Sequence, residues 1–152
     1  MTELNLPRFS PRLRQSGIRT EIFDLLRHRY VALTPEENVR QHFVNYLVVH
    51  LGYPSGLMAN EVSLSLNGLT RRCDTVLYDR ELHPRMIIEY KRPSVHITQR
   101  VFDQVSRYNI VMKVDYLIVS NGLTHYCCKM YYDGQTYEFL DEIPMYENLK
   151  FK

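Results

Sequence analysis

The sequence predicts a mixed α/β domain in which helices flank a central β-sheet. Two amphipathic stretches have the apolar spacing of helices, and several short runs rich in Val, Ile, Leu and Tyr have the composition of strands. Their order along the chain is helix, three strands, helix and further strands. A helix between two strands predicts a crossover connection and therefore a mixed sheet. The 152 residues suffice for one domain with a substantial core.

Composition and charge exclude several classes of protein. The net charge of +2 is too small to predict a nucleic-acid partner by itself. No apolar run approaches the roughly 18 residues of a membrane span, and the first residues lack the apolar core of a signal peptide. We therefore expect a soluble, cytoplasmic protein with no membrane partner. Three cysteines without CxxC spacing predict reduced, packed thiols instead of a disulfide or a zinc site.

The first helix is predicted within residues 33–54. Thr34 is a good N-cap, Pro35 suits the first helical position, and two acids fill the first turn. Apolar residues then recur at helical spacing as far as Leu51. Gly52 follows, so we expect the helix to end there.

The remaining elements follow from composition and turn residues. Strands are predicted within residues 61–66, 71–79, 85–93, 114–122, 125–134 and 136–143, and a second helix within residues 97–113. Residues 1–33 are interpreted as an arm with an extended hairpin that packs on the domain, although Leu, Arg and Phe there also allow a helix. The domain proper is then residues 34–152.

The strand MIIEYKRPS carries an acid and an amine near its end. Glu89 and Lys91 are two residues apart, so they lie on the same face of a strand. Asp74 can lie across from Glu89 if the two strands pair through the turn between them. Two carboxylates and a backbone carbonyl suit Mg²⁺ or Mn²⁺, and a nearby lysine can orient an attacking water or stabilise a phosphate. The alternative is an edge strand with a surface ion pair.

The two predicted helices add further polar candidates. Gln104 and Tyr108 are four residues apart and therefore share one helical face, where the amide can hold a base, a phosphate or a water. Either Glu36 or Glu37 can add a carboxylate. We prefer Glu36 because it aligns with the apolar face of its helix, although an acid is also favoured there by the helix dipole.

These residues carry a resemblance to a known family. The order Glu36, Asp74, Glu89-Tyr90-Lys91 and Gln104-x-x-x-Tyr108 resembles the PD-(D/E)xK nuclease superfamily. It is most similar to the N-terminal nuclease domain of the restriction (R) subunit of type I restriction enzymes. The likeness spans about residues 31–143, through LTPEENVRQHFVNYLVVHLGYP, LNGLTRRCDTVLYD, IIEYKRPS, FDQVSRYN and YLIVSNGLTHYC.

The resemblance implies a restriction-endonuclease-like fold and a role for each residue. Asp74 and Glu89 would bind Mg²⁺, with Lys91 acting in phosphodiester hydrolysis. The auxiliary motif would consist of Gln104 and Tyr108. Tyr108 is also a candidate DNA contact, because its ring can stack on a base or brace Gln104. The resemblance makes several arginines candidates for contacts with the DNA backbone, namely Arg71, Arg72, Arg92, Arg100 and Arg107.

The sequence departs from the family pattern at three points. Cys73 stands where the motif has proline, and Tyr90 is bulkier than usual, so we expect its ring to face away from the metal. No Walker GxxxxGK[ST] motif is present, so the chain is not expected to translocate DNA by itself. It can act alone, as a homodimer, or with a helicase motor or modification and specificity subunits in trans.

Three functions remain open at this stage. The first is a divalent-metal-dependent DNA endonuclease that leaves a 5′-phosphate. The second is a catalytically silent nuclease-fold module that binds DNA or a partner protein. The third, a small-molecule enzyme using Cys127 or His125, lacks an acid partner for either residue.

Overall fold

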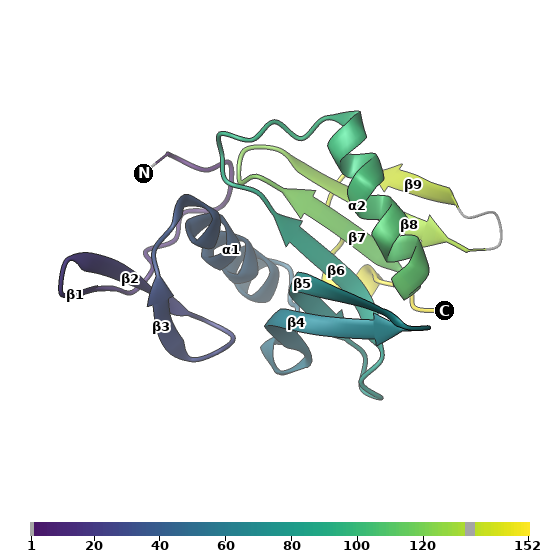
Figure 1. The fold of residues 1–152 in the computed structure, drawn as a ribbon, viewed down its shortest axis with the longest axis horizontal. Helices are drawn as coiled ribbons and strands as arrows, with labels where there is room; N and C mark the ends of the chain where they lie inside the picture. Colours follow the sequence, from purple (N-terminus) through teal and green to yellow (C-terminus); the bar gives the residue numbers. More distant parts are fainter. Residues whose placement is uncertain (1, 133–135) are drawn as a thin grey trace.

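The computed structural model describes residues 2–132 and 136–152, without the side chains of residues 108–111. Within these residues the chain forms a six-stranded mixed sheet, a smaller three-stranded antiparallel sheet and two α-helices. Figure 1 shows how these elements are arranged. The small sheet consists of β1 (Leu13–Ser16), β2 (Arg19–Asp24) and β3 (Arg29–Ala32). The large sheet has the order β4 (Met58–Leu66), β5 (Leu69–Tyr78), β6 (Pro84–Tyr90), β7 (Tyr116–Ser120), β8 (His125–Tyr131) and β9 (Thr136–Leu140).

The first helix, α1 (Pro35–Asn45), begins as predicted. The Thr34 hydroxyl accepts a hydrogen bond of 3.0 Å from the main-chain N–H of Glu37. Beyond Asn45 the chain continues as a π-helical turn, Tyr46–His50, and then reaches Gly52 with φ of +77°. The predicted helix is therefore confirmed, but its last part is wound more loosely than an α-helix.

The second helix, α2 (Gln99–Met112), connects two neighbouring strands of the large sheet. β6 and β7 are parallel, whereas the other pairs of that sheet are antiparallel. The predicted crossover and mixed sheet are confirmed. All five residues of β7 are buried, as expected for a strand between two neighbours with both faces covered.

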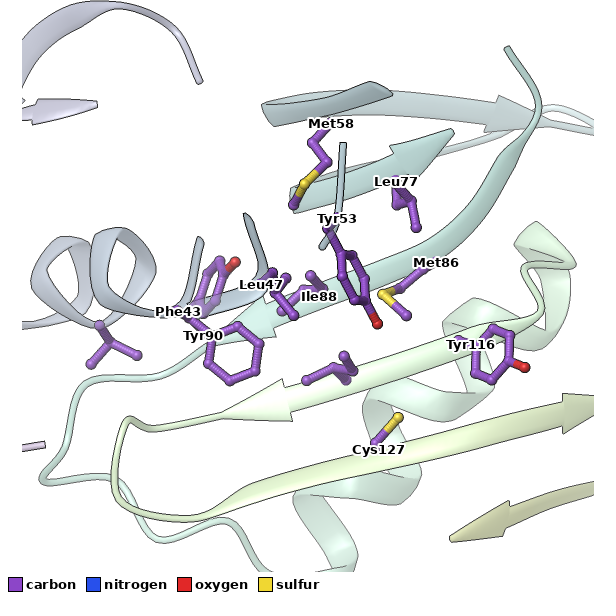
Figure 2. Packing of buried hydrophobic residues seen from close by; sticks show 12 residues of the cluster. Phe43, Leu47, Tyr53, Met58, Leu77, Met86, Ile88, Tyr90, Tyr116 and Cys127 are labelled. Carbon is purple, nitrogen blue, oxygen red and sulfur yellow. The ribbon is translucent and has the colours of Figure 1, made fainter. Parts of the chain in front are cut away.

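Side chains on the two faces of the large sheet form two apolar clusters. On the α1 face, Phe43 and Leu47 pack against Ile88 and Tyr90 of β6, and Figure 2 shows these four side chains together. Ile87 belongs to the opposite cluster, beneath α2, with Phe102 and Val105 among its members. Because side chains alternate along a strand, Glu89 shares the α2 face with Ile87. The Tyr90 ring lies in the cluster on the α1 face, opposite the face that carries Glu89.

The extended hairpin predicted near the N-terminus is confirmed as β1, β2 and β3, and hydrogen bonds connect it to the large sheet. Asp24 at the end of β2 accepts bonds of 3.1 and 3.2 Å from the Asn60 amide. The Thr75 hydroxyl donates to Asn60 at 2.6 Å, and the Tyr90 hydroxyl donates to Thr75 at 2.9 Å. This buried chain of polar groups links the small sheet to the strand that carries Glu89. The division into an arm of residues 1–33 and a domain of residues 34–152 stays a prediction.

Two bulk expectations can be compared with the structure. Cys73, Cys127 and Cys128 are free and buried, which confirms the packed thiols. Within the described ranges, neither helix has the length and hydropathy needed to cross a bilayer.

Candidate functional site

The carboxylates of Asp74 and Glu89 meet where β5 and β6 pair. Thr75 lies opposite Ile88 in the antiparallel register, which brings the preceding Asp74 and the following Glu89 together. The main-chain N–H of Tyr90 donates a bond of 2.8 Å to Asp74 Oδ2. Burial, followed by the negative charge of Asp74, raises the pKa of Glu89 to about 8. The structure thus brings together the two acids that the sequence singled out.

Arg71 lies inside this site. Its Nη2 donates a hydrogen bond of 2.6 Å to Glu89 Oε1, and both side chains are largely buried. The guanidinium charge lowers the pKa of Glu89 and so offsets part of the effect of burial and Asp74. The sequence pattern did not indicate this ion pair between neighbouring strands and suggested Arg71 only as a DNA contact. That contact stays a prediction.

An open cleft of about 790 Å³ lies beside the acids, between the sheet and α2. Glu89, Lys91 and Gln104 all line it, so three of the four predicted catalytic residues converge on one cavity. Lys91 directly follows β6, and its main-chain N–H donates to Ser120 O at 2.8 Å. That bond holds the segment after β6 against β7. The complete lining consists of Leu69, Arg71, Arg72, Glu89, Lys91, Gln104, Val105 and Arg107.

The two glutamates at the start of α1 differ in their surroundings. Glu37 is buried and accepts two bonds from Arg40, of 2.7 and 2.8 Å, and one of 2.9 Å from Gln41. Glu36 is exposed, yet partial desolvation and then the charge of Asp74 raise its pKa, while Arg40 and Lys91 oppose the rise. Glu37 is therefore held in a structural ion pair. Glu36 is the acid whose pKa responds to the charges of Asp74 and Lys91 in the site.

Sequence reasoning missed Arg40, which supports the position of Asp74. Its Nη1 donates a bond of 3.1 Å to the main-chain oxygen of Asp74. The same guanidinium pairs with Glu37 and with Glu61 at 2.9 Å, and Glu61 also binds Arg72 at 2.8 Å. The three-residue spacing of Glu37 and Arg40 could have indicated a helical ion pair, but not the contact with β5.

The other residues offered as DNA contacts lie in different places. Arg107 is exposed on α2 and lines the cleft. Arg92 and Arg100 are exposed outside the cleft lining, and Arg72 lines the cleft while paired with Glu61. The side chain of Tyr108 lies outside the described residues. All of these DNA contacts stay predictions.

The donor atoms at the site suit a hard divalent cation. Mg²⁺ usually binds one or two carboxylates and completes its shell with waters and phosphate oxygens, and Mn²⁺ also favours oxygen ligands. The raised pKa of Glu89 reflects in part repulsion from Asp74, which a cation between the two carboxylates would relieve. In the part of the chain that the structure describes, no group of three or more His, Cys, Asp or Glu side chains is placed to hold a metal ion. Glu36 is therefore not gathered with Asp74 and Glu89 into a ready three-acid site.

Cys127 and His125 have the surroundings of core residues. Burial raises the pKa of the Cys127 thiol to about 12, which disfavours the thiolate that a nucleophile needs. His125 Nδ1 lies 2.7 Å from the Ser120 hydroxyl and its Nε2 lies 2.8 Å from the main-chain oxygen of Asn5. These contacts favour a packing role for both residues over nucleophilic catalysis.

The mixed sheet, its crossover helix and the acids beside Lys91 and Gln104 define the restriction-endonuclease-like class of fold, as predicted. The family model of the type I restriction enzyme R protein N terminus (HSDR_N) matches residues 35–144. The chain belongs to this family.

A solved structure agrees with the fold. A fragment assigned to the HsdR subunit of a type I restriction enzyme from Vibrio vulnificus YJ016 matches with a TM-score of 0.52 and 16% sequence identity. The match covers 74% of this chain but only 24% of the fragment, so this chain spans about a quarter of that relative. No curated protein sequence matches this chain.

Proposed function

We propose that this chain is a divalent-metal-dependent DNA endonuclease, equivalent to the nuclease part of a type I restriction R subunit. The observation that carries the proposal is the convergence of Asp74 and Glu89, 15 residues apart in the chain, beside the cleft that Lys91 and Gln104 line. Membership of the R protein N-terminal family supports the same conclusion.

Each residue has a role that follows from its position. Asp74 and Glu89 would hold Mg²⁺ or Mn²⁺, and the bound ion would supply Lewis acidity and a more acidic water. Lys91 places a positive charge in the cleft, where it can orient a water or stabilise charge on a phosphate. Gln104 is exposed on α2 and can hydrogen-bond the phosphate or the water. Hydrolysis in this site would leave a 5′-phosphate.

The proposed partners follow from the family and from the charges around the cleft. Arg107 lies in the cleft and the nearby Arg92 and Arg100 are exposed, so they are candidates to bind the phosphates of DNA. Because this chain covers 24% of the matched HsdR fragment, a helicase motor or modification and specificity subunits would act in trans or in further sequence. A homodimer would place one nuclease site on each of the two strands of the DNA duplex. Such a system would operate in the cytoplasm.

A second candidate function is favoured by one specific observation. Arg71 places a positive charge 2.6 Å from Glu89, at the carboxylate that a metal ion would need. A permanent ion pair there would leave a nuclease fold that binds DNA or a protein without cutting it. The two candidates differ in whether the wild-type protein hydrolyses DNA.

Cleavage assays on the purified chain separate the candidates. Plasmid and single-stranded DNA would be incubated with Mg²⁺ or Mn²⁺ and with wild-type protein, Asp74→Asn or Lys91→Ala. We expect the two variants to lose cleavage by about 100-fold or more. Asp141→Asn and Lys150→Ala are matched controls, because both residues are exposed and lie outside the cleft lining.

Two outcomes would contradict the nuclease assignment. Cleavage that persists at the wild-type rate in both Asp74→Asn and Lys91→Ala would come from a contaminant. DNA binding by the wild type without cleavage under either metal would support the silent binding module instead.

A further inference from the structure

The ion pair between Arg71 and Glu89 has a consequence for metal binding. Arg71 Nη2 lies 2.6 Å from Glu89 Oε1, and the exposed fractions of the two side chains are 16% and 11%. At this distance and burial the positive charge is weakly screened by solvent. The guanidinium therefore satisfies the same carboxylate that a divalent cation would bind, and the two cations repel each other.

The surroundings of Arg71 also offer it a second anion. Arg71 lines the same cleft as Lys91 and Gln104, so a phosphate that enters the cleft comes within reach of the arginine. A guanidinium matches the paired oxygens of a phosphate as well as those of a carboxylate. A change of side-chain rotamer on β5 can transfer the guanidinium from Glu89 to the phosphate, with no movement of the sheet.

We propose that Arg71 is an electrostatic gate that couples metal binding to DNA binding at this site. In the free protein it pairs with Glu89 and competes with the divalent cation. When DNA occupies the cleft, a backbone phosphate takes the guanidinium, and Glu89 becomes accessible to the metal. This inference rests on the proposed function for the identities of its two ligands.

The gate has a thermodynamic signature that does not require catalysis. If DNA raises the affinity for the metal by some factor, the metal must raise the affinity for DNA by the same factor. Arg71 would be the residue through which much of this coupling passes. Its neighbour Arg72 differs, because its guanidinium pairs with Glu61 at 2.8 Å and makes no contact with Glu89 among the described residues.

Binding of Mn²⁺ alone, measured by electron paramagnetic resonance, tests the gate on the whole chain. Titrations would be made with and without a short duplex whose phosphorothioate linkages resist cleavage. For the wild type we expect the Mn²⁺ affinity to rise about tenfold or more with DNA. Arg71→Gln should bind Mn²⁺ about tenfold more tightly than wild type without DNA, and should gain less than about threefold from DNA.

Two further variants separate the ion pair from general charge effects. Arg72→Gln removes the same charge one residue away, so its Mn²⁺ affinity without DNA should stay within about twofold of wild type. Arg71→Lys keeps a positive charge beside Glu89, so its affinity should stay within about threefold. If Arg71→Gln fails to fold, the gate can still be overturned, either by a wild-type Mn²⁺ affinity that DNA does not alter or by a tenfold gain in Arg71→Lys.

Several results would overturn the gate. These are an unchanged or weaker Mn²⁺ affinity in Arg71→Gln, an equal gain in Arg72→Gln, a tenfold gain in Arg71→Lys, or a wild-type affinity that DNA does not alter. Failure of the proposed function is distinguishable from failure of the gate. Metal-dependent cleavage with no effect of Arg71→Gln on Mn²⁺ binding removes the gate alone, and coupled binding without cleavage removes the nuclease activity alone.

Discussion

The main-chain N–H of Tyr90 donates a hydrogen bond of 2.8 Å to the carboxylate of Asp74. Tyr90 lies between Glu89 and Lys91, so this bond connects the acid on β5 directly to the segment that carries the other two groups. Asp74 is also bound at its main-chain oxygen, which accepts a hydrogen bond from the guanidinium of Arg40. The relative position of Asp74, Glu89 and Lys91 is therefore set by backbone contacts as well as by side-chain packing.

Substitution of the two glutamates at the start of α1 should affect different properties, namely stability for Glu37 and metal binding for Glu36. Glu37→Gln breaks a buried ion pair with Arg40, so the free energy of unfolding should fall by about 3 kcal/mol. Glu36→Gln changes an exposed side chain, so stability should change by less than about 0.5 kcal/mol. Under the proposed function, Glu36→Gln should also weaken Mn²⁺ binding. Urea denaturation and Mn²⁺ titration measure the two effects, and an equal loss of stability in both variants would contradict the assignment.

The raised pKa of Glu89 predicts how stability depends on pH in the metal-free protein. Burial and then Asp74 raise the pKa of Glu89 from 4.5 to about 8 against the opposing charge of Arg71, so the folded state binds this proton more tightly than the unfolded state does. Between these two values the folded state binds one more proton than the unfolded state. The contribution of Glu89 to the free energy of unfolding is therefore fully present below pH 4.5 and is lost as the pH rises toward 8.

Glu89→Gln removes this titration and so isolates it. Loss of the pair with Arg71 lowers the stability of the variant by an amount that does not depend on this titration. On top of that offset, we expect the stability difference to shift in favour of the variant by about 1 to 3 kcal/mol between pH 5.5 and pH 7.5. Urea denaturation in the presence of a chelator measures the difference at each pH. Carboxyl ¹³C titration by NMR provides the control, because the resonance that is missing in the variant identifies Glu89. A stability difference that stays constant over this range would contradict the prediction.

Arg107 should contribute to DNA binding through its place in the cleft. If it neutralises one phosphate, Arg107→Gln should reduce the slope of log affinity against log salt by about 1. Arg80 is a matched control, because it is an exposed arginine in the turn between β5 and β6, outside the cleft lining. Fluorescence anisotropy with a labelled duplex at several salt concentrations gives both slopes. Equal slopes for Arg107→Gln and wild type would remove Arg107 from the DNA interface.

The sequence by itself determined the elements and much of the site. Local signals were sufficient for α1, because the Thr34 cap and the Pro35 start act within one turn. The alternation of side chains predicted that Glu89 on β6 and Lys91, which directly follows β6, share one face and that Tyr90 takes the other. The family pattern then predicted that Asp74 and Gln104 would join them, and the structure brings Asp74 to Glu89 and Gln104 to the same cleft.

Only the tertiary structure decided which charges meet. Arg71 pairs with Glu89 although 18 residues separate them, and Arg40 binds the backbone of Asp74 although 34 residues separate them. Glu36 and Glu37 are neighbours with the same side chain, and only the packing of α1 made one structural and left the other exposed. The physical reason is that charge pairing depends on distance and burial in three dimensions, which periodicity and composition along the chain do not specify.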